Sequence, residues 1–104
     1  MAYEDIVLTD NTTLNRFELK VEYSIAFIDY KHSHGLLFLI HTEVPPTLKG
    51  KGVAGVIVQK TLQYAKDNNY QIVPICPFVQ SYLKKHPEWN AIVTPNAERF
   101  LHNH

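Results

Sequence analysis

The chain has 104 residues, of which 45% are hydrophobic, and its ten basic side chains balance its ten acidic ones. This length suits one hydrophobic core, so we expect a single domain over residues 1–104. The balanced charge argues against a general nucleic-acid-binding protein, because such proteins carry a basic excess. The lone cysteine, Cys76, excludes an internal disulfide and favours a reducing compartment, which is the cytoplasm by default. We expect neither a signal peptide nor a membrane span, since no apolar run approaches about 20 residues.

The first half of the chain predicts a three-stranded antiparallel meander. Residues 1–15 are rich in Asn, Thr and Asp, and we expect them to form a loose lead-in. Residues 16–21 alternate apolar and charged side chains, which is the period of a half-exposed strand. Residues 24–31 follow after a short connection and predict its antiparallel partner. Beyond a turn at residues 32–35, residues 36–44 form an almost continuous apolar run, which is typical of a strand buried on both faces.

A helix follows the third predicted strand. Pro45 and Pro46 end the strand, because proline lacks the N–H group that a central strand donates. From residue 52 to about residue 69 the apolar side chains recur at helical spacing. Asn68 and Asn69 are typical of a helix end, since asparagine tolerates the left-handed conformation.

The last third of the chain predicts one more central strand and a short helix. Residues 71–75 form a short run rich in β-branched side chains, as in a buried strand. Because a helix separates them from residues 36–44, we expect the two strands to be parallel and joined by a crossover. Residues 78–85 predict a second helix, residues 89–93 a last strand or a packed loop, and residues 94–104 a loose end. The fold class is therefore α/β, with a mixed sheet.

A glycine- and lysine-rich loop lies between the third strand and the long helix. Gly50, Gly52 and Gly55 have the spacing of a dinucleotide-binding fingerprint, but two prolines precede them and no acidic residue ends the next strand. The loop nevertheless combines flexible backbone with the positive end of a helix dipole and the charges of Lys49 and Lys51. It therefore predicts a site for a phosphate or pyrophosphate. An ordinary glycine turn with two solvated lysines is the alternative.

Three segments together resemble a known family: "RFELKVEYSIAFIDY", "LIHTEVPPTLKGKGVAG" and "PICPFVQSYLKKHPEW". They look like the short, single-domain GNAT-like N-acetyltransferases, in which the usual helical N-terminal part is missing. The likeness covers roughly residues 16–93. Gly50 and Gly52 match the glycines of the acetyl-CoA-binding motif, whereas Thr47 stands where that motif has Gln or Arg. The resemblance implies a minimal GNAT-like acyl-CoA N-acyltransferase fold.

The resemblance also implies a cofactor, a second substrate and a set of binding residues. The third strand would splay from its parallel neighbour, and the gap would hold the pantetheine arm of acetyl-CoA or coenzyme A. The second substrate would be an amine, either a small molecule or a protein lysine. The arm would bond to the backbone of Thr42, Glu43 and Val44. The pyrophosphate would lie on the amides of Lys49, Gly50, Lys51, Gly52, Val53 and Ala54.

Four side chains are candidates for a role in acetyl transfer. Histidine changes charge near neutral pH, so His41 can act as the base, unless it is a structural histidine of the strand. The resemblance places Cys76 beside the thioester, where it would act as a nucleophile, line the pocket or serve as a small buried hydrophobe. Many GNAT enzymes have, on the short helix that follows Cys76 here, a tyrosine that protonates the leaving thiolate. Tyr82 lies in this helix and would have that role; the alternative is that its ring only packs in the core. Glu43 is a second possible base or amine-binding group.

Two other functions stay open at this stage, together with the question of a metal. A non-catalytic acyl-CoA-binding or sensing module would keep the glycine loop without needing His41 or Cys76. A partner-binding domain would need no cofactor at all. The remaining histidines lack the spacing of a metal site, and we expect none. They are His32, His34, His86, His102 and His104.

Overall fold

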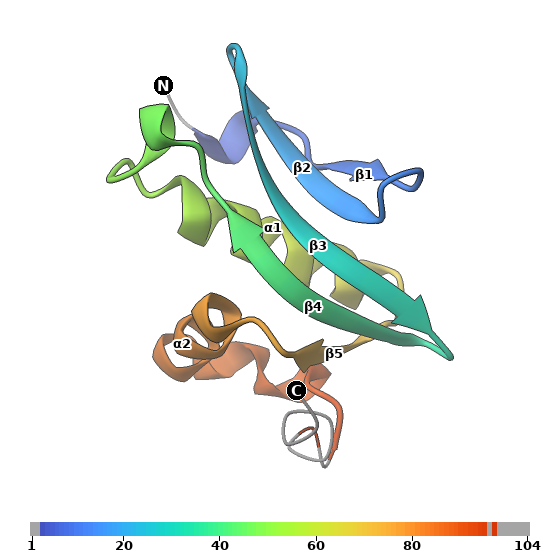
Figure 1. Cartoon of the computed structure of the whole chain (residues 1–104). Coiled ribbons are helices and arrows are strands. Elements are labelled where there is room, and N and C mark those ends of the chain that lie inside the picture. Colours follow the sequence, from blue (N-terminus) through green and yellow to red (C-terminus); the bar gives the residue numbers. More distant parts are fainter. Residues whose placement is uncertain (1–2, 96, 98–104) are drawn as a thin grey trace.

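The structure of the protein is a computed structural model that describes residues 3–95 and residue 97 (Figure 1). Three short 3-10 helices are labelled η. The elements are η1 (Tyr3–Asp5), β1 (Thr9–Asn11), β2 (Arg16–Val21), β3 (Ser24–Ser33), β4 (Leu36–Glu43), η2 (Pro46–Leu48), α1 (Val53–Asp67), β5 (Gln71–Pro74), α2 (Pro77–Lys85) and η3 (Pro87–Ile92).

The strands form one sheet in the order β1-β2-β3-β4-β5. β1 to β4 pair antiparallel with their neighbours in sequence, and β5 pairs parallel with β4. The crossover between β4 and β5 contains α1, which packs on β2, β3, β4 and β5 (Figure 1). The predicted mixed sheet, with a meander followed by a parallel strand, is therefore confirmed.

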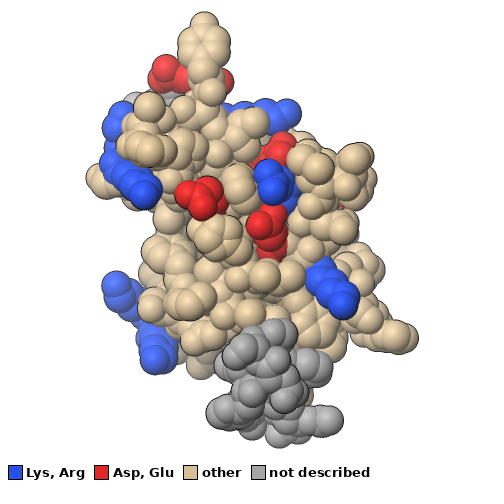
Figure 2. Space-filling model, viewed as in Figure 1, with Lys and Arg blue, Asp and Glu red and all other residues tan. Residues whose placement is uncertain are grey.

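The hydrophobic core lies between the sheet and the two α-helices. Phe17, Leu19 and Val21 of β2 point into it, as the alternation of residues 16–21 predicted. α1 and α2 contribute the buried residues Val53, Ile57, Val58, Leu62, Ala65, Val79 and Leu83. Figure 2 looks onto the other side of the sheet, where basic and acidic side chains adjoin. Arg16 and Asp29 form an ion pair there at 3.2 Å, and the guanidinium of Arg16 lies 3.8 Å from the ring centre of Phe27.

The expectation of a loose lead-in over residues 1–15 is wrong for residues 9–11. They form β1, in which Thr9 lies opposite Glu18 and Asn11 opposite Arg16. The polar side chains of this strand have partners inside the fold, because the Tyr30 hydroxyl donates to Asp10 at 2.6 Å. The amide of Asn11 donates to Glu18 at 3.1 Å. Glu18 is consequently only 6% exposed, although its place in the alternation predicted a solvent-facing side chain.

Most of the expected second loose end, residues 94–104, lies outside the described residues, namely residue 96 and residues 98–104. Thr94 is buried, and its N–H donates to the carbonyl of Ile72 at 3.0 Å. Of the two alternatives for residues 89–93, the structure has a packed segment. Most of it belongs to η3, and Val93 makes a single parallel bridge to Ile72.

The expectation that residues 36–44 are buried on both faces is also wrong. Leu37 and Leu39 are buried, but Ile40 is 42% exposed. Ile40 lies on the outer face of β4 with Leu36 and Phe38, which are only partly buried. A β-bulge occurs at this point, since Tyr30 pairs with Leu39 whereas Asp29 pairs with His41. Ile40 is thus the extra residue of β4, and the side chains beyond it alternate in a new phase.

The bounds of α1 agree with the predicted helix start and stop. The N-cap is Gly52, with a left-handed φ of 78°. The C-cap is Asn68, and Asn69 follows with a φ of 61°, which is the left-handed conformation predicted for this stop.

Candidate active site

β4 and β5 diverge in the middle of the molecule (Figure 1). Their parallel register ends with Leu39 opposite Pro74, while β4 continues to Glu43. The N–H of Cys76 makes one more bond to the carbonyl of Leu39, at 2.8 Å, before the chain turns into α2 at Pro77. Among the described residues, the last part of β4 therefore has no parallel partner strand on this side.

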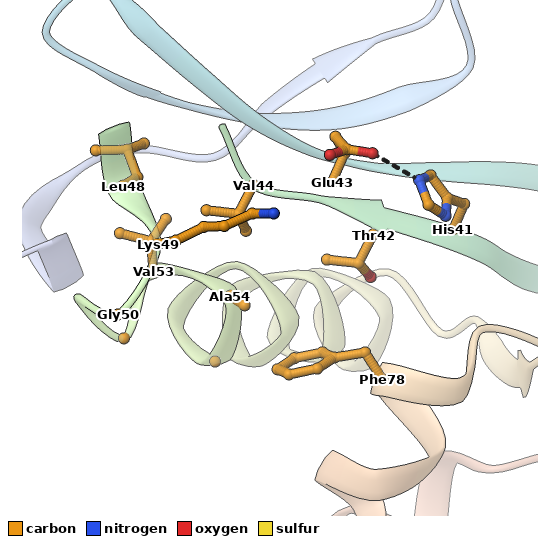
Figure 3. A pocket seen from close by; sticks show the side chains of 12 residues that line it. His41, Thr42, Glu43, Val44, Leu48, Lys49, Gly50, Val53, Ala54 and Phe78 are labelled. Carbon is orange, nitrogen blue, oxygen red and sulfur yellow. Dashed lines mark hydrogen bonds and ion pairs between the residues drawn. The ribbon is translucent and has the colours of Figure 1, made fainter. Parts of the chain in front are cut away.

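A cavity of about 550 Å³ opens beside this divergence (Figure 3). Its volume is in the range of small-molecule sites, roughly 300–1,000 Å³. It extends from the end of β4, across η2 and the glycine loop, to the first turn of α1 and the start of α2. The lining residues are His41, Thr42, Glu43, Val44, Leu48, Lys49, Gly50, Gly52, Val53, Ala54, Gly55 and Phe78.

One end of this cavity is suited to an anion. The N-cap Gly52 provides no side-chain cap, and the first turn of α1 contains no acidic residue. Helix geometry leaves the N–H groups of Val53, Ala54 and Gly55 without intrahelical acceptors, and these three residues line the cavity. The positive end of the helix dipole lies at the same place. The side chain of Lys49 lies in the cavity as well (Figure 3).

The other end of the cavity lies near the single thiol. Thr42 faces the helices, since it pairs with the buried Ile28, and its hydroxyl oxygen lies 3.4 Å from the Cys76 sulfur. Cys76 is only 3% exposed and is the N-cap of α2. The thiol therefore borders the cavity through Thr42, which lines it.

His41 and Glu43 form a pair on the opposite side of β4 from Thr42. Their side chains meet through Nε2 and Oε1 at 3.0 Å and are 56% and 48% exposed. Both residues line the cavity, and Figure 3 shows their contact above Thr42. Because strand neighbours point to opposite faces, the His41 imidazole lies across β4 from the Thr42–Cys76 contact. The expectation that Glu43 shares a face with His41 is confirmed.

Tyr82 lies on α2, next to α1. A methyl group added at Gly55 would come 3.9 Å from its ring, and the ring stacks on His86 with centroids 4.2 Å apart. Burial, and to a smaller degree the charge of Glu88, raises the pKa of Tyr82 above its ordinary value. The phenol is therefore protonated at neutral pH, as a proton donor must be.

The structure gathers nine of the twelve predicted site residues around one cavity. Of the others, Cys76 and Tyr82 lie one contact behind its wall, at Thr42 and Gly55. Lys51 lines a different cavity beside the β2–β3 turn. Sequence reasoning missed Leu48, Gly55 and Phe78. The position of Phe78, two residues after Cys76 at the start of a predicted helix, was the available signal for its place at the site.

Two further findings bear on alternative functions. Within residues 3–95 and 97, no group of three or more His, Cys, Asp or Glu side chains is arranged to hold a metal ion. His102 and His104 lie outside the described residues. The same part of the chain contains no helix with the length and apolar character needed to cross a membrane.

The mixed sheet opens between its two parallel strands, and the cavity with the start of α1 lies at that opening. The family model described as GCN5-related N-acetyl-transferase matches residues 16–92. The chain therefore belongs to the GCN5-related N-acetyl-transferase family. Membership of this family supports acyltransferase activity in general.

Proposed function

We propose that this protein binds acetyl-CoA in the 550 Å³ cavity and transfers the acetyl group to an amine. The observation that carries the proposal is the arrangement of the cavity wall. The free first-turn amides of α1 lie at one end, and the part of β4 beyond its pairing with β5 lies at the other. A coenzyme with a pyrophosphate and an amide-containing arm needs both features. When bound, acetyl-CoA supplies an acyl group activated as a thioester.

The proposed binding residues divide into two groups. The backbone of Thr42, Glu43 and Val44 bonds to the arm of the coenzyme as an added strand would. Lys49, Gly50, Gly52, Val53 and Ala54 hold the pyrophosphate, and Gly55 adds a third first-turn amide. Lys51 is the one predicted phosphate contact with weaker support, because it lines another cavity.

His41 is the proposed catalytic base, which accepts the proton that the attacking amine loses. Its imidazole is half-exposed, so an amine arriving from solvent has access to it. Glu43 accepts a hydrogen bond from the Nε2 position of the ring at 3.0 Å and fixes its orientation. Nδ1 is thereby left as the nitrogen that takes the proton.

Direct transfer to the amine is the route that the geometry favours over acylation of Cys76. The thiol is buried and touches Thr42, which stands between it and the cavity. We therefore propose that Cys76 forms the wall at the acyl end of the site. Tyr82 is the proposed proton donor to the departing thiolate, since its phenol carries a proton at neutral pH. A free thiol in this position also suits a reducing compartment such as the cytoplasm.

A thermal-unfolding titration with acetyl-CoA, followed by a transfer assay and intact-mass measurement, tests the proposal. A ligand at 100 times its dissociation constant adds about 2.7 kcal/mol to the free energy of unfolding. We expect this stabilisation in the wild type and in His41→Gln, with acetyl transfer lost only in the variant. His34→Asn, in an exposed turn with a φ of 51°, is the matched histidine control and should keep both properties. No stabilisation at millimolar acetyl-CoA contradicts the proposal. A 42 Da gain on Cys76 replaces direct transfer with an acyl-enzyme route, and stabilisation without transfer to any amine indicates a binding module.

A further inference from the structure

We propose that a second cavity, between β1–β3 and the C-terminal half of α1, binds a small organic cation with a methylated ammonium group. This cavity encloses about 200 Å³, far more than the roughly 10–15 Å³ that a single water needs. Most of its wall is aromatic, and it contains one carboxylate. The residues used below are Asp10, Phe17, Tyr30, His32, Tyr64 and Tyr70.

The strand register brings the carboxylate and the rings to one face of the sheet. Asp10 lies directly opposite Phe17, so both side chains point toward α1. Tyr30 of β3 is buried on that same face. Tyr64 comes from α1, and Tyr70 lies between α1 and β5. Residues far apart in the sequence thus converge on one cavity.

The rings are in contact with one another around this space. Phe17 stacks on Tyr30 with centroids 4.4 Å apart, and Tyr64 lies tilted against Phe17 at 5.0 Å. The rings of Tyr64 and Tyr70 are nearly parallel, with an interplanar angle of 23° at 6.2 Å. His32 meets Tyr70 edge-on at 4.6 Å. Phe17 and Tyr30 cover each other and form the base of the cavity, so a cation would meet the π faces of Tyr64 and Tyr70. Aromatic rings attract cations through their π faces, and aromatic cages recognise quaternary ammonium groups.

The polar groups of the cavity point to the same ligand. The Asp10 carboxylate accepts hydrogen bonds from the hydroxyls of Tyr30 at 2.6 Å and Tyr64 at 3.4 Å. Among the residues that the structure describes, it forms no ion pair with a lysine or arginine. Its negative charge therefore lies beside an aromatic cavity without a lysine or arginine partner in the part of the chain that the structure describes. Both hydroxyls are already directed at Asp10, which leaves little to bind an anion, whereas an apolar cation satisfies both the charge and the rings.

This cavity is separate from the proposed acetyl-CoA site. The two share no lining residue. Ala54 lines the first cavity and Tyr64 the second, and ten residues of helix between them correspond to about 15 Å. Binding of a cation is therefore measured independently of acetyl transfer, and the proposal stands whether or not the coenzyme binds.

Titration of the full-length protein with choline, monitored by NMR of its backbone amides, tests the proposal. The neutral isostere 3,3-dimethylbutan-1-ol is the matched control ligand, since it has the same shape without the charge. We expect choline to shift the amides of Asp10, Tyr30, Tyr64 and Tyr70 saturably, and the isostere to bind at least about fivefold more weakly. Equal binding of the two ligands, or no saturable shift with choline, overturns the proposal. End-blocked trimethyllysine in parallel identifies the source of the cation, because its tighter binding points to a methylated protein and its weaker binding to a small metabolite.

Variants of the cavity separate cation binding from a merely structural role of this network. Tyr70→Leu removes one ring and should weaken choline binding by about threefold to thirtyfold, whereas Tyr70→Phe keeps the ring and should bind nearly as the wild type. Asp10→Asn keeps a hydrogen-bond acceptor and removes the charge, so we expect it to lower the affinity for choline about fivefold or more. If Asp10→Asn fails to fold, the Tyr70 pair alone decides. Equal affinities of Tyr70→Leu and Tyr70→Phe contradict the proposed site.

Discussion

The hydroxyl oxygen of Thr42 lies 3.4 Å from the Cys76 sulfur, and this contact joins the end of β4 to the N-cap of α2. Thr42 lines the large cavity, whereas the thiol behind it is only 3% exposed. The threonine side chain therefore stands between the cavity and the thiol.

Truncation of Thr42 should expose Cys76 to thiol reagents. We expect Thr42→Ala to raise the rate of modification by a disulfide reagent about fivefold, the equivalent of one lost hydrogen bond of about 1 kcal/mol. Thr47→Ala is the matched control, because the Thr47 hydroxyl bonds to Ser24 at 2.8 Å and not to the thiol. Equal rates in the wild type and Thr42→Ala contradict the shielding role.

Alanine at Gly52, the N-cap of α1, and at Gly55, in its first turn, should change stability in opposite directions. Gly52 has a φ of 78°, so Gly52→Ala should lower the free energy of unfolding by about 1–2 kcal/mol. Gly55 has no such constraint, and a methyl group there would make an ordinary contact of 3.9 Å with Tyr82. Gly55→Ala should therefore stabilise the helix by about 0.5–1 kcal/mol. Urea unfolding measures both, and a loss of stability in Gly55→Ala contradicts the prediction.

The two lysines of the loop should differ in their effect on coenzyme binding. Lys49 lines the large cavity, whereas Lys51 lines the neighbouring one with Tyr23 and Thr47. Lys49→Ala should weaken the binding of coenzyme A about fivefold at low salt, and the loss should shrink as salt screens the charge. Lys51→Ala, the matched control, should have a smaller effect in calorimetric titrations. A larger loss in Lys51→Ala would place the phosphates on the other side of the loop.

Tyr30 should make the stability of the protein depend on alkaline pH. Burial, together with the hydrogen bond to Asp10, raises the pKa of Tyr30 well above its ordinary value of 10.0. The folded protein then holds the phenolic proton more tightly than the unfolded chain, so stability falls as the pH rises above about 10. Tyr30→Phe loses a bond to a carboxylate and should be about 1.5–3 kcal/mol less stable at pH 7.

The difference in the free energy of unfolding between Tyr30→Phe and the wild type should become smaller above pH 10, because phenylalanine has no proton to lose. Urea unfolding at pH 7, pH 10 and pH 11 measures this. Tyr23→Phe is the control, since Tyr23 is fully exposed and its replacement should leave the profile unchanged. A difference that stays constant with pH contradicts the assignment to Tyr30.

The sequence predicted the parts of the fold that depend on local pattern. The alternation of residues 16–21, the helix between Gly52 and Asn69 and the proline stop after β4 are all local signals, and they place the glycine loop correctly. β1 was not predicted because it has only three residues, and Asp10 contacts its partners Tyr30 and Tyr64 only in the folded chain. The bulge at Ile40 could not be predicted either, because it arises from the pairing of β4 with β3 and not from the sequence of β4 itself.

The same distinction applies to the candidate site. Residues 41–44 and the glycine loop were found because they are contiguous and carry a recognisable pattern. The phase change at Ile40 puts Thr42, and not His41, on the face of β4 that carries Leu37 and Leu39, which no inspection of "LIHTEV" reveals. The place of Phe78 depends on how α2 leaves β5, which is likewise a property of the folded chain.

The divergence of β4 from β5 follows from the way β5 ends. The N–H of Ile75 bonds back to the carbonyl of Val73 at 3.1 Å, and the N–H of Cys76 makes one further bond to β4 before Pro77 begins α2. Among the described residues, no strand pairing therefore has to be broken to admit a ligand at the last part of β4. We expect an incoming coenzyme to meet a preformed opening, so the observed association rate should rise linearly with ligand concentration and show no plateau from an opening step.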